Sequence, residues 1–327
     1  MHDEKGYDTK PDVASFNIVI TAISRSGRDD APMQAERVVQ MMQERENTKP
    51  DTITFNAVLN AWSQSSKKSA PARAQHILEF LIKHPKLEPD IVTFSTTMNA
   101  WARSKDAEKV QKTKELLDRL LTMYEEGDRP KSLKPTSVPF NTLINACGFP
   151  NPNATEEERK HFLQIAASTY GRLRNYKGAR PDTVTYGNML KCIGKLLPMG
   201  DTRIKLARQI FDQCVSDGLV GYLVWDEMTQ TVPFDALEPI LPVPLLEGLE
   251  VGEDIDHSRL PRRWRNNVPL KQDRIKKEQK MLVLKKELGA KEKPRGMRKG
   301  RIKRIGLQYT AHGENSWGAG GGGSGIP

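Results

Sequence analysis

Residues 50–62 read PDTITFNAVLNAW, and this stretch decides the fold because versions of its first seven residues recur along the chain. The five versions are PDVASFN (11–17), PDTITFN (50–56), PDIVTFS (89–95), PTSVPFN (135–141) and PDTVTYG (181–187). After the aromatic residue of each version, apolar residues return three, four and seven positions later, a spacing that places them on one face of an α-helix. The sets are Phe16, Val19, Ile20 and Ile23; Phe55, Val58, Leu59 and Trp62; Phe94, Met98 and Trp101, with Thr97 the polar exception; Phe140, Leu143, Ile144 and Cys147; and Tyr186, Met189, Leu190 and Ile193.

A second helical stripe follows each first one. Neither helix of such a pair can bury its apolar face alone, whereas stacked pairs share a continuous core. The sequence therefore predicts an all-α, right-handed α-solenoid of stacked helix-turn-helix repeats. The second stripes are Ala35, Val38, Val39 and Met42; Ala74, Ile77, Leu78 and Leu81; Thr113, Leu116, Leu117 and Leu120; Ala166, Thr169, Tyr170 and Leu173; and Ala207, Ile210, Phe211 and Cys214.

Charge and spacing divide the chain into five parts. Residues 1–12 resemble the end of an upstream repeat, so we expect the chain to start inside a longer array, and residues 13–218 hold the five helix pairs. Residues 219–258 form an acidic hinge or a degenerate repeat, 259–304 a largely irregular basic tail, and 305–327 a glycine-rich, disordered end. Two insertions, within 122–134 and 149–160, interrupt the repeat spacing, and their Pro, Gly, Asn and charged residues predict surface loops.

The composition argues against several classes of protein. The 327 residues carry a formal net charge of +10, and no apolar run approaches the ~20 residues that cross a bilayer. Three cysteines without a CxxC pair argue against a disulfide scaffold and a zinc module, and the six histidines show no ligand spacing. We therefore expect no metal, no cofactor and no membrane insertion. A zinc deaminase needs HxE followed by CxxC, and because no CxxC pair occurs the signature is incomplete, so the chain is not expected to be an enzyme.

The repeated unit P-D-x-V-T-F/Y-N-x-L-I/L-x-A-W, followed by A-x-x-I-L/F, resembles the pentatricopeptide repeat over residues 11–218, although these units are longer than usual for that family. The resemblance implies single-stranded RNA binding at one base per repeat. It also implies a mitochondrial or plastid location, although the chain shows no targeting segment, and a role as a non-enzymatic adaptor in organellar RNA stability, processing or translation. The alternative is a protein–protein scaffold whose basic tail docks on an acidic partner or on ribosomal RNA.

In the family that the chain resembles, two residues read each base: the one after the aromatic residue and the one before the next repeat. Carried over, the pairs are Asn17 with Asp51, Asn56 with Asp90, Ser95 with Thr136, and Asn141 with Asp182, whereas Gly187 has no partner. The positions expected to pack against the bases are Ile53, Val92, Val138 and Val184, with Ala14 the weaker one.

An Asn/Asp pair is expected to favour uracil, because Asn donates to a carbonyl and Asp accepts from the ring N–H. Ser with Thr specifies little, so the array is expected to read 5′-U-U-N-U-3′ and to prefer U-rich RNA.

Two of these assignments have competing interpretations. An Asp that follows Pro and precedes a helix can serve as a helix cap alone. In the basic tail, arginines surround Trp264, which either stacks on a base or docks the tail on the solenoid. The candidate phosphate-binding residues are Arg259, Arg262, Arg263, Arg265, Arg301, Lys303 and Arg304.

Overall fold

The computed structural model describes residues 11–127, 130–237, 239, 241 and 260–269. Within these ranges every regular element is a helix, as the all-α prediction requires. The predicted disordered end, part of the acidic hinge (238, 240 and 242–258), and the phosphate-binding candidates Arg259, Arg301, Lys303 and Arg304 lie outside the described residues.

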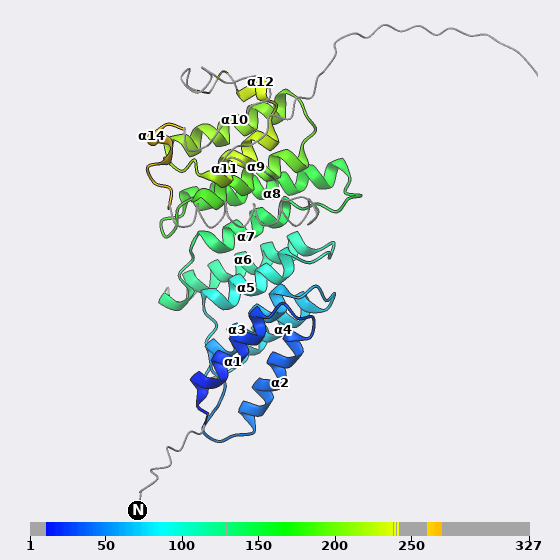
Figure 1. The fold of residues 1–327 in the computed structure, drawn as a ribbon, viewed down its shortest axis with the longest axis vertical. Helices are drawn as coiled ribbons and strands as arrows, with labels where there is room; N and C mark the ends of the chain where they lie inside the picture. The colour runs from blue at the N-terminus through cyan, green and yellow to red at the C-terminus, as the bar shows by residue number, and fades with distance from the viewer. Residues whose placement is uncertain (1–10, 128–129, 238, 240, 242–259, 270–327) are drawn as a thin grey trace, which may run out of the picture.

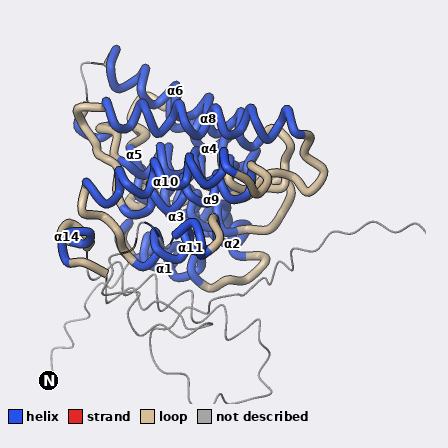
Figure 2. Tube along the Cα trace, turned by 90° about the horizontal axis from the view of Figure 1, so that it is seen from above, coloured by secondary structure: helices blue, strands red, loops and turns tan. Residues whose placement is uncertain are grey.

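Five helix pairs stack along the long axis of the molecule (Figure 1). The first helices of successive pairs contact one another in the order α1, α3, α5, α7 and α9, and α11 continues this row. Seen along that axis, α6 and α8 lie on one side of the stack and α1 and α11 on the other (Figure 2). The pairs are α1 (Val13–Arg25) with α2 (Ala31–Gln43), α3 (Thr52–Gln64) with α4 (Ala70–Lys83), α5 (Ile91–Ala102) with α6 (Lys109–Glu126), α7 (Ser137–Cys147) with α8 (Glu156–Asn175), and α9 (Thr183–Leu196) with α10 (Asp201–Ser216).

The repeated Pro-Asp dipeptide starts first helices because its carboxylate caps them. Asp51, Asp90 and Asp182 each accept a hydrogen bond from the backbone N–H of the third helical residue, at 2.7, 2.8 and 2.9 Å. That third residue is Thr in all three helices, and its hydroxyl returns a contact to the backbone of the cap, which completes a capping box. The dipeptide therefore fixes where α3, α5 and α9 begin.

The predicted stripes form the core, although Ile23, Val38, Tyr170 and Ile210 are only partly buried and one stripe residue is exposed. Ile20, Leu59, Met98, Ile144 and Leu190 of the first helices are fully buried. Val19, expected on the apolar stripe of α1, is instead 47% exposed. The reason is that α1 begins the described array and packs only against α2 and α3, so no described helix covers that side.

The three cysteines are free and buried among these stripes. Burial raises the pKa of the Cys147 thiol to about 12, which leaves it protonated and chemically quiet at neutral pH.

The two insertions lie partly in helices and not wholly in surface loops. Residues 122–126, inside the first insertion, form the last turn of α6, and the short 3-10 helix η1 (Lys131–Leu133) follows. Glu156, inside the second insertion, begins α8, where Thr155 and Glu158 form a capping box. The loop expectation therefore holds for only part of each range, because Met123 and Tyr124 pack against the core and extend α6, and the Thr155 cap begins α8 inside the second range.

Beyond the fifth pair, α11 (Tyr222–Thr231) lies inside the segment expected to be an acidic hinge or a degenerate repeat, and it packs against α9. Two short helices, α12 (Phe234–Leu237) and α14 (Arg262–Arg265), follow, and α14 contacts α10. Trp264 of α14 is buried and meets the ring of Phe211 edge-on at 5.6 Å between centroids. The side chain therefore docks the start of the basic tail on the solenoid, and its indole is not available for base stacking.

Candidate nucleic-acid interface

Three of the four base-reading pairs expected from the sequence are in direct contact. The side-chain amide of Asn17 donates to the Asp51 carboxylate at 3.3 Å, that of Asn56 to Asp90 at 3.1 Å, and that of Asn141 to Asp182 at 3.0 Å. Each pair joins the first helix of one repeat to the cap of the next first helix. We call these contacts the first (α1/α3), second (α3/α5) and fourth (α7/α9) junctions.

Each of these junctions contains a third residue that the sequence analysis did not select. The buried hydroxyls of Thr54, Thr93 and Thr185 lie 2.7, 2.8 and 2.7 Å from the amide oxygens of Asn17, Asn56 and Asn141, respectively. These are the same threonines that complete the capping boxes. The available signal was the Thr that precedes the aromatic residue in three of the five motifs.

The aspartates are therefore both helix caps and partners of the asparagines, so the two interpretations of these residues are not exclusive. Burial raises the pKa of the Asp51 carboxyl, but hydrogen bonds from Thr54 and Asn17 outweigh this effect and hold the pKa below its ordinary value. Asp51 is thus a stable anion and hydrogen-bond acceptor at neutral pH. At the fourth junction, the Ser137 hydroxyl adds a 2.7 Å bond to Asp182.

The residues expected to pack against bases lie two positions beyond each cap, beside the polar pairs. Ile53, Val92 and Val138 are 64%, 49% and 52% exposed, which is high for large aliphatic side chains. Ala14 is also exposed, and Val184 is partly buried. Aliphatic side chains repeated in this register provide apolar surfaces between which flat rings can fit.

The third junction (α5/α7) differs from the others at every polar position. Ser95 replaces Asn, Thr136 replaces Asp, and Pro139 stands where the other junctions have Thr. The Ser95 hydroxyl is buried and makes no hydrogen bond within the described structure. Thr136 is exposed and caps α7 through a 3.3 Å bond from the Val138 N–H. This junction holds no Asn/Asp pair.

Gly187, expected to read a base, is instead buried beneath α11. A Cβ at this position would lie 2.8 Å from Cγ of Leu223, so Leu223 occupies the space that a side chain would take. Gly221 is the cap residue of α11 and provides no carboxylate. Sequence reasoning missed this contact because α11 has no Pro-Asp start to mark it as a further first helix.

The two tryptophans that end apolar stripes belong to the core, as expected. The indole N–H of Trp62 donates to Glu36 and that of Trp101 donates to Gln75, each at 3.0 Å, and both rings are buried. Of the tail arginines that the structure describes, Arg262 and Arg263 are exposed on α14 and Arg265 is partly buried, and α14 contacts the second helix α10.

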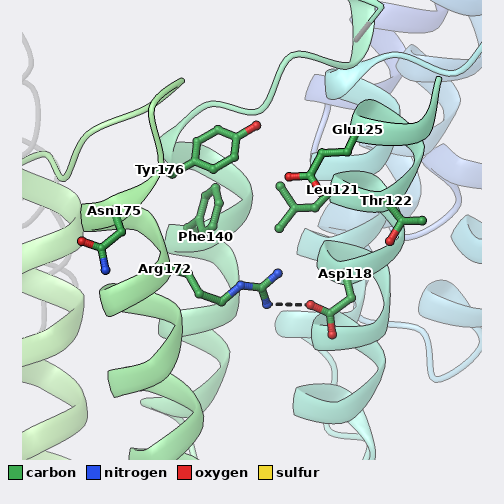
Figure 3. Close-up of a pocket in the computed structure, with 8 residues that line it drawn as sticks. All are labelled: Asp118, Leu121, Thr122, Glu125, Phe140, Arg172, Asn175 and Tyr176. Carbon is green, nitrogen blue, oxygen red and sulfur yellow. Dashed lines mark hydrogen bonds and ion pairs between the residues drawn. The ribbon is translucent and has the colours of Figure 1, made fainter. Parts of the chain in front are cut away.

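A cavity of about 460 Å³ lies between the second helices α6 and α8 (Figure 3). Arg172 crosses it to reach the Asp118 carboxylate at 2.6 Å, and Phe140 and Tyr176 form its apolar side. No base-reading candidate lines this cavity. Among the described residues, no group of His, Cys, Asp or Glu is arranged to hold a metal ion, and no helix is long and apolar enough to span a membrane.

Stacked helix pairs with polar residues repeated in phase across their first helices define a helical-repeat protein. A family model, the pentatricopeptide repeat domain, matches residues 1–65 and agrees with the predicted resemblance over that part of the chain. No curated protein matches the chain in sequence.

Solved structures of one protein are similar to this chain. The pentatricopeptide repeat protein PPR10 in complex with an 18-nt psaJ RNA element is 20% identical, with a TM-score of 0.39, over 75% of this chain and 30% of that one. A variant of PPR10 with cysteines replaced by serine, bound to the same element, gives the same values. PPR10 from maize is 17% identical, with a TM-score of 0.28, over 66% of this chain and 36% of that one. The chain thus spans about a third of the length of the structures it matches.

Proposed function

We propose that the first helices bind single-stranded RNA and select uracil at the first, second and fourth junctions, with the chain acting as a non-enzymatic adaptor in organellar RNA stability, processing or translation. The observation that carries this proposal is the recurrence, in one register, of an Asn/Asp pair beside an exposed aliphatic residue. Packing of the core does not require a polar pair at the surface, and capping of the helix requires only the Asp. Neither structural role therefore explains the recurring Asn.

The hydrogen-bonding capacity left over at each pair fits uracil. An amide has two N–H donors and two carbonyl lone pairs. In Asn56, one donor goes to Asp90 and one lone pair faces Thr93, so one donor and one lone pair remain. The remaining donor can bond a uracil carbonyl, and the adjacent carboxylate can accept from the ring N–H. Adenine has no carbonyl for the donor and no ring N–H for the carboxylate.

The exposed aliphatic residues supply apolar contacts with the faces of the bases. A base at the second junction would lie with its faces toward Ile53 and Val92, both largely exposed without RNA. Covering them with a ring removes apolar surface from water whatever the base, at roughly 25 cal/mol per Å². Stacking therefore contributes affinity without sequence preference, and the polar pair supplies the preference.

The test is RNA selection from a random pool with the purified full chain, followed by titrations of U-rich and A-rich oligomers. Asn56→Ala should weaken binding to the U-rich strand by about 1–3 kcal/mol and affect the A-rich strand less. The matched control is Asn60→Ala, one turn later on α3, where the amide bonds the Ser24 hydroxyl at 3.2 Å and contacts no aspartate.

Equal losses on both strands would make Asn56 a structural residue. A selection that enriches no RNA would reject the function and favour the protein scaffold.

A further inference from the structure

We propose that Thr54, Thr93 and Thr185 are positioning residues that lock the amide of the neighbouring Asn in one orientation and thereby produce the uracil preference. The inference rests on the proposed function, because it assigns a role to residues that would not touch the RNA. None of the three threonines belongs to the pairs expected to read the bases.

The geometry is the same at all three junctions. Each threonine is fully buried. Its hydroxyl oxygen accepts a hydrogen bond from the backbone N–H of the cap Asp, at 3.1 Å from Asp51 and at 3.0 Å from both Asp90 and Asp182. With that contact made, the hydroxyl proton is directed toward the Asn carbonyl and the adjacent Asp carboxylate, the two acceptors within reach.

The chemistry of the groups then permits one amide orientation. An ionised carboxylate only accepts hydrogen bonds, so the side of the amide that faces Asp90 must be the NH₂ group. The side that faces the Thr93 hydroxyl proton must be the carbonyl oxygen. A flipped Asn56 would set its oxygen against the carboxylate and its NH₂ against the hydroxyl proton, and it would lose both bonds. The threonine and the aspartate thus fix the places of the free N–H and the free lone pair that meet the base.

The third junction is consistent with this dependence. There the Asn, the Asp and the Thr are all replaced, by Ser95, Thr136 and Pro139. Proline has no hydroxyl and could not orient an amide even if Asn and Asp were present. The three positions therefore behave as one unit, and a junction without the hydroxyl is expected to select no base.

The experiment compares Thr93→Val, which keeps the shape of the side chain and removes the hydroxyl, with Thr93→Ser, which keeps the hydroxyl. Thr97→Val is the control, because Thr97 is equally buried on α5 but bonds only the Thr93 backbone carbonyl, at 2.9 Å. Each full-length protein is titrated with RNA oligomers that contain the expected 5′-U-U-N-U-3′ pattern. In these oligomers, either the second or the fourth base of the pattern is U or is replaced by A.

The wild-type protein should prefer U at the second position by about tenfold. Thr93→Val should reduce this preference to within about threefold and leave the preference at the fourth position intact, whereas Thr93→Ser and Thr97→Val should keep both. The proposal is overturned if Thr93→Val retains the full preference, or if Thr97→Val loses it as well. A wild-type protein that binds RNA with no U preference, or binds none, would reject the proposed function itself.

A gain-of-function series guards against a Thr93→Val protein that fails to fold. Ser95→Asn with Thr136→Asp restores the pair at the third junction, and adding Pro139→Thr restores the hydroxyl. Selection of U at the third position should appear with the triple variant and remain weak with the double variant. Equal U preference in the two proteins would show that the hydroxyl has no orienting role.

Discussion

Asp90 is the residue at which capping and base reading can be separated by experiment. Its carboxylate accepts the Thr93 backbone N–H at 2.8 Å and the Asn56 amide at 3.1 and 3.2 Å. Asp90→Ala removes both interactions. Loss of the cap costs about 1 kcal/mol, and the half-buried Asn56 amide also loses its acceptor, so unfolding should become easier by about 1–3 kcal/mol.

Two further substitutions divide that loss. Asp90→Ser keeps a good cap, because a hydroxyl replaces the carboxylate oxygen that accepts the backbone N–H, but it removes the negative charge and the second oxygen, which accepts from Asn56 at 3.2 Å. Stability should return most of the way while the U preference at the second position stays lost. Asp90→Asn keeps the shape and presents an amide donor instead of an acceptor. Cytosine has an unprotonated ring nitrogen where uracil has N–H, so this variant should shift its preference toward cytosine.

The assays are urea denaturation for stability and fluorescence anisotropy with oligomers that carry U, C or A at the second position. The reasoning fails if Asp90→Ser binds U-rich RNA with the full wild-type preference, because Asp90 would then be a helix cap and nothing more. It also fails if Asp90→Asn loses affinity equally for all three bases.

Two other predictions concern the end of the base-reading row and the tail. Gly187→Ala should destabilise the protein by about 1 kcal/mol, because the added Cβ would lie 2.8 Å from Leu223 Cγ. In a Leu223→Ala background the same change should be neutral or stabilising, since Ala favours the helix, and urea denaturation of the four proteins would decide. Ending the chain after Pro269 removes 15 Lys or Arg and five acidic residues but keeps Trp264 docked. The truncated chain should bind RNA more weakly at low salt, its affinity should depend less on salt, and its U preference should remain. Titrations across a salt series measure the slope of log affinity against log salt concentration. An unchanged slope would show that the tail does not contact RNA.

Sequence reasoning succeeded where the information is local and repeated. The apolar spacing after Phe55 predicts a buried helical face without any knowledge of its partner. The pairing of Asn56 with Asp90, 34 residues apart, was expected because the resemblance implied that both residues read one base, whereas their direct hydrogen bond is a finding of the structure. The helix caps followed from Pro-Asp alone.

What escaped prediction depends on packing between segments with no shared pattern. Leu223 fills the place beside Gly187 although α11 lacks the motif that marked the other first helices. Trp264 had two interpretations in the sequence, and only its edge-on contact with Phe211 distinguishes them. The orienting threonines were visible in the motif, but their capping role explains them fully until the distances to the asparagines are known.

Under the proposed function, having only three Asn/Asp junctions also limits how selectively the array can bind RNA by itself. A pattern with three selected bases recurs by chance about once in 64 positions, so it cannot single out one transcript among many competing sites. Each selected base contributes about 1–3 kcal/mol, from which the cost of ordering a flexible strand must be subtracted. Between α9 and α11, Leu223 covers Gly187, so α11 adds no further selected base within the described row. Selectivity for a single target therefore requires a second source of affinity.

The basic segment 259–304, with 19 Lys or Arg and four acidic residues, can supply affinity through phosphate contacts but no base preference. The choice of target must then come from further base-reading contacts or from a partner that places this chain beside its RNA.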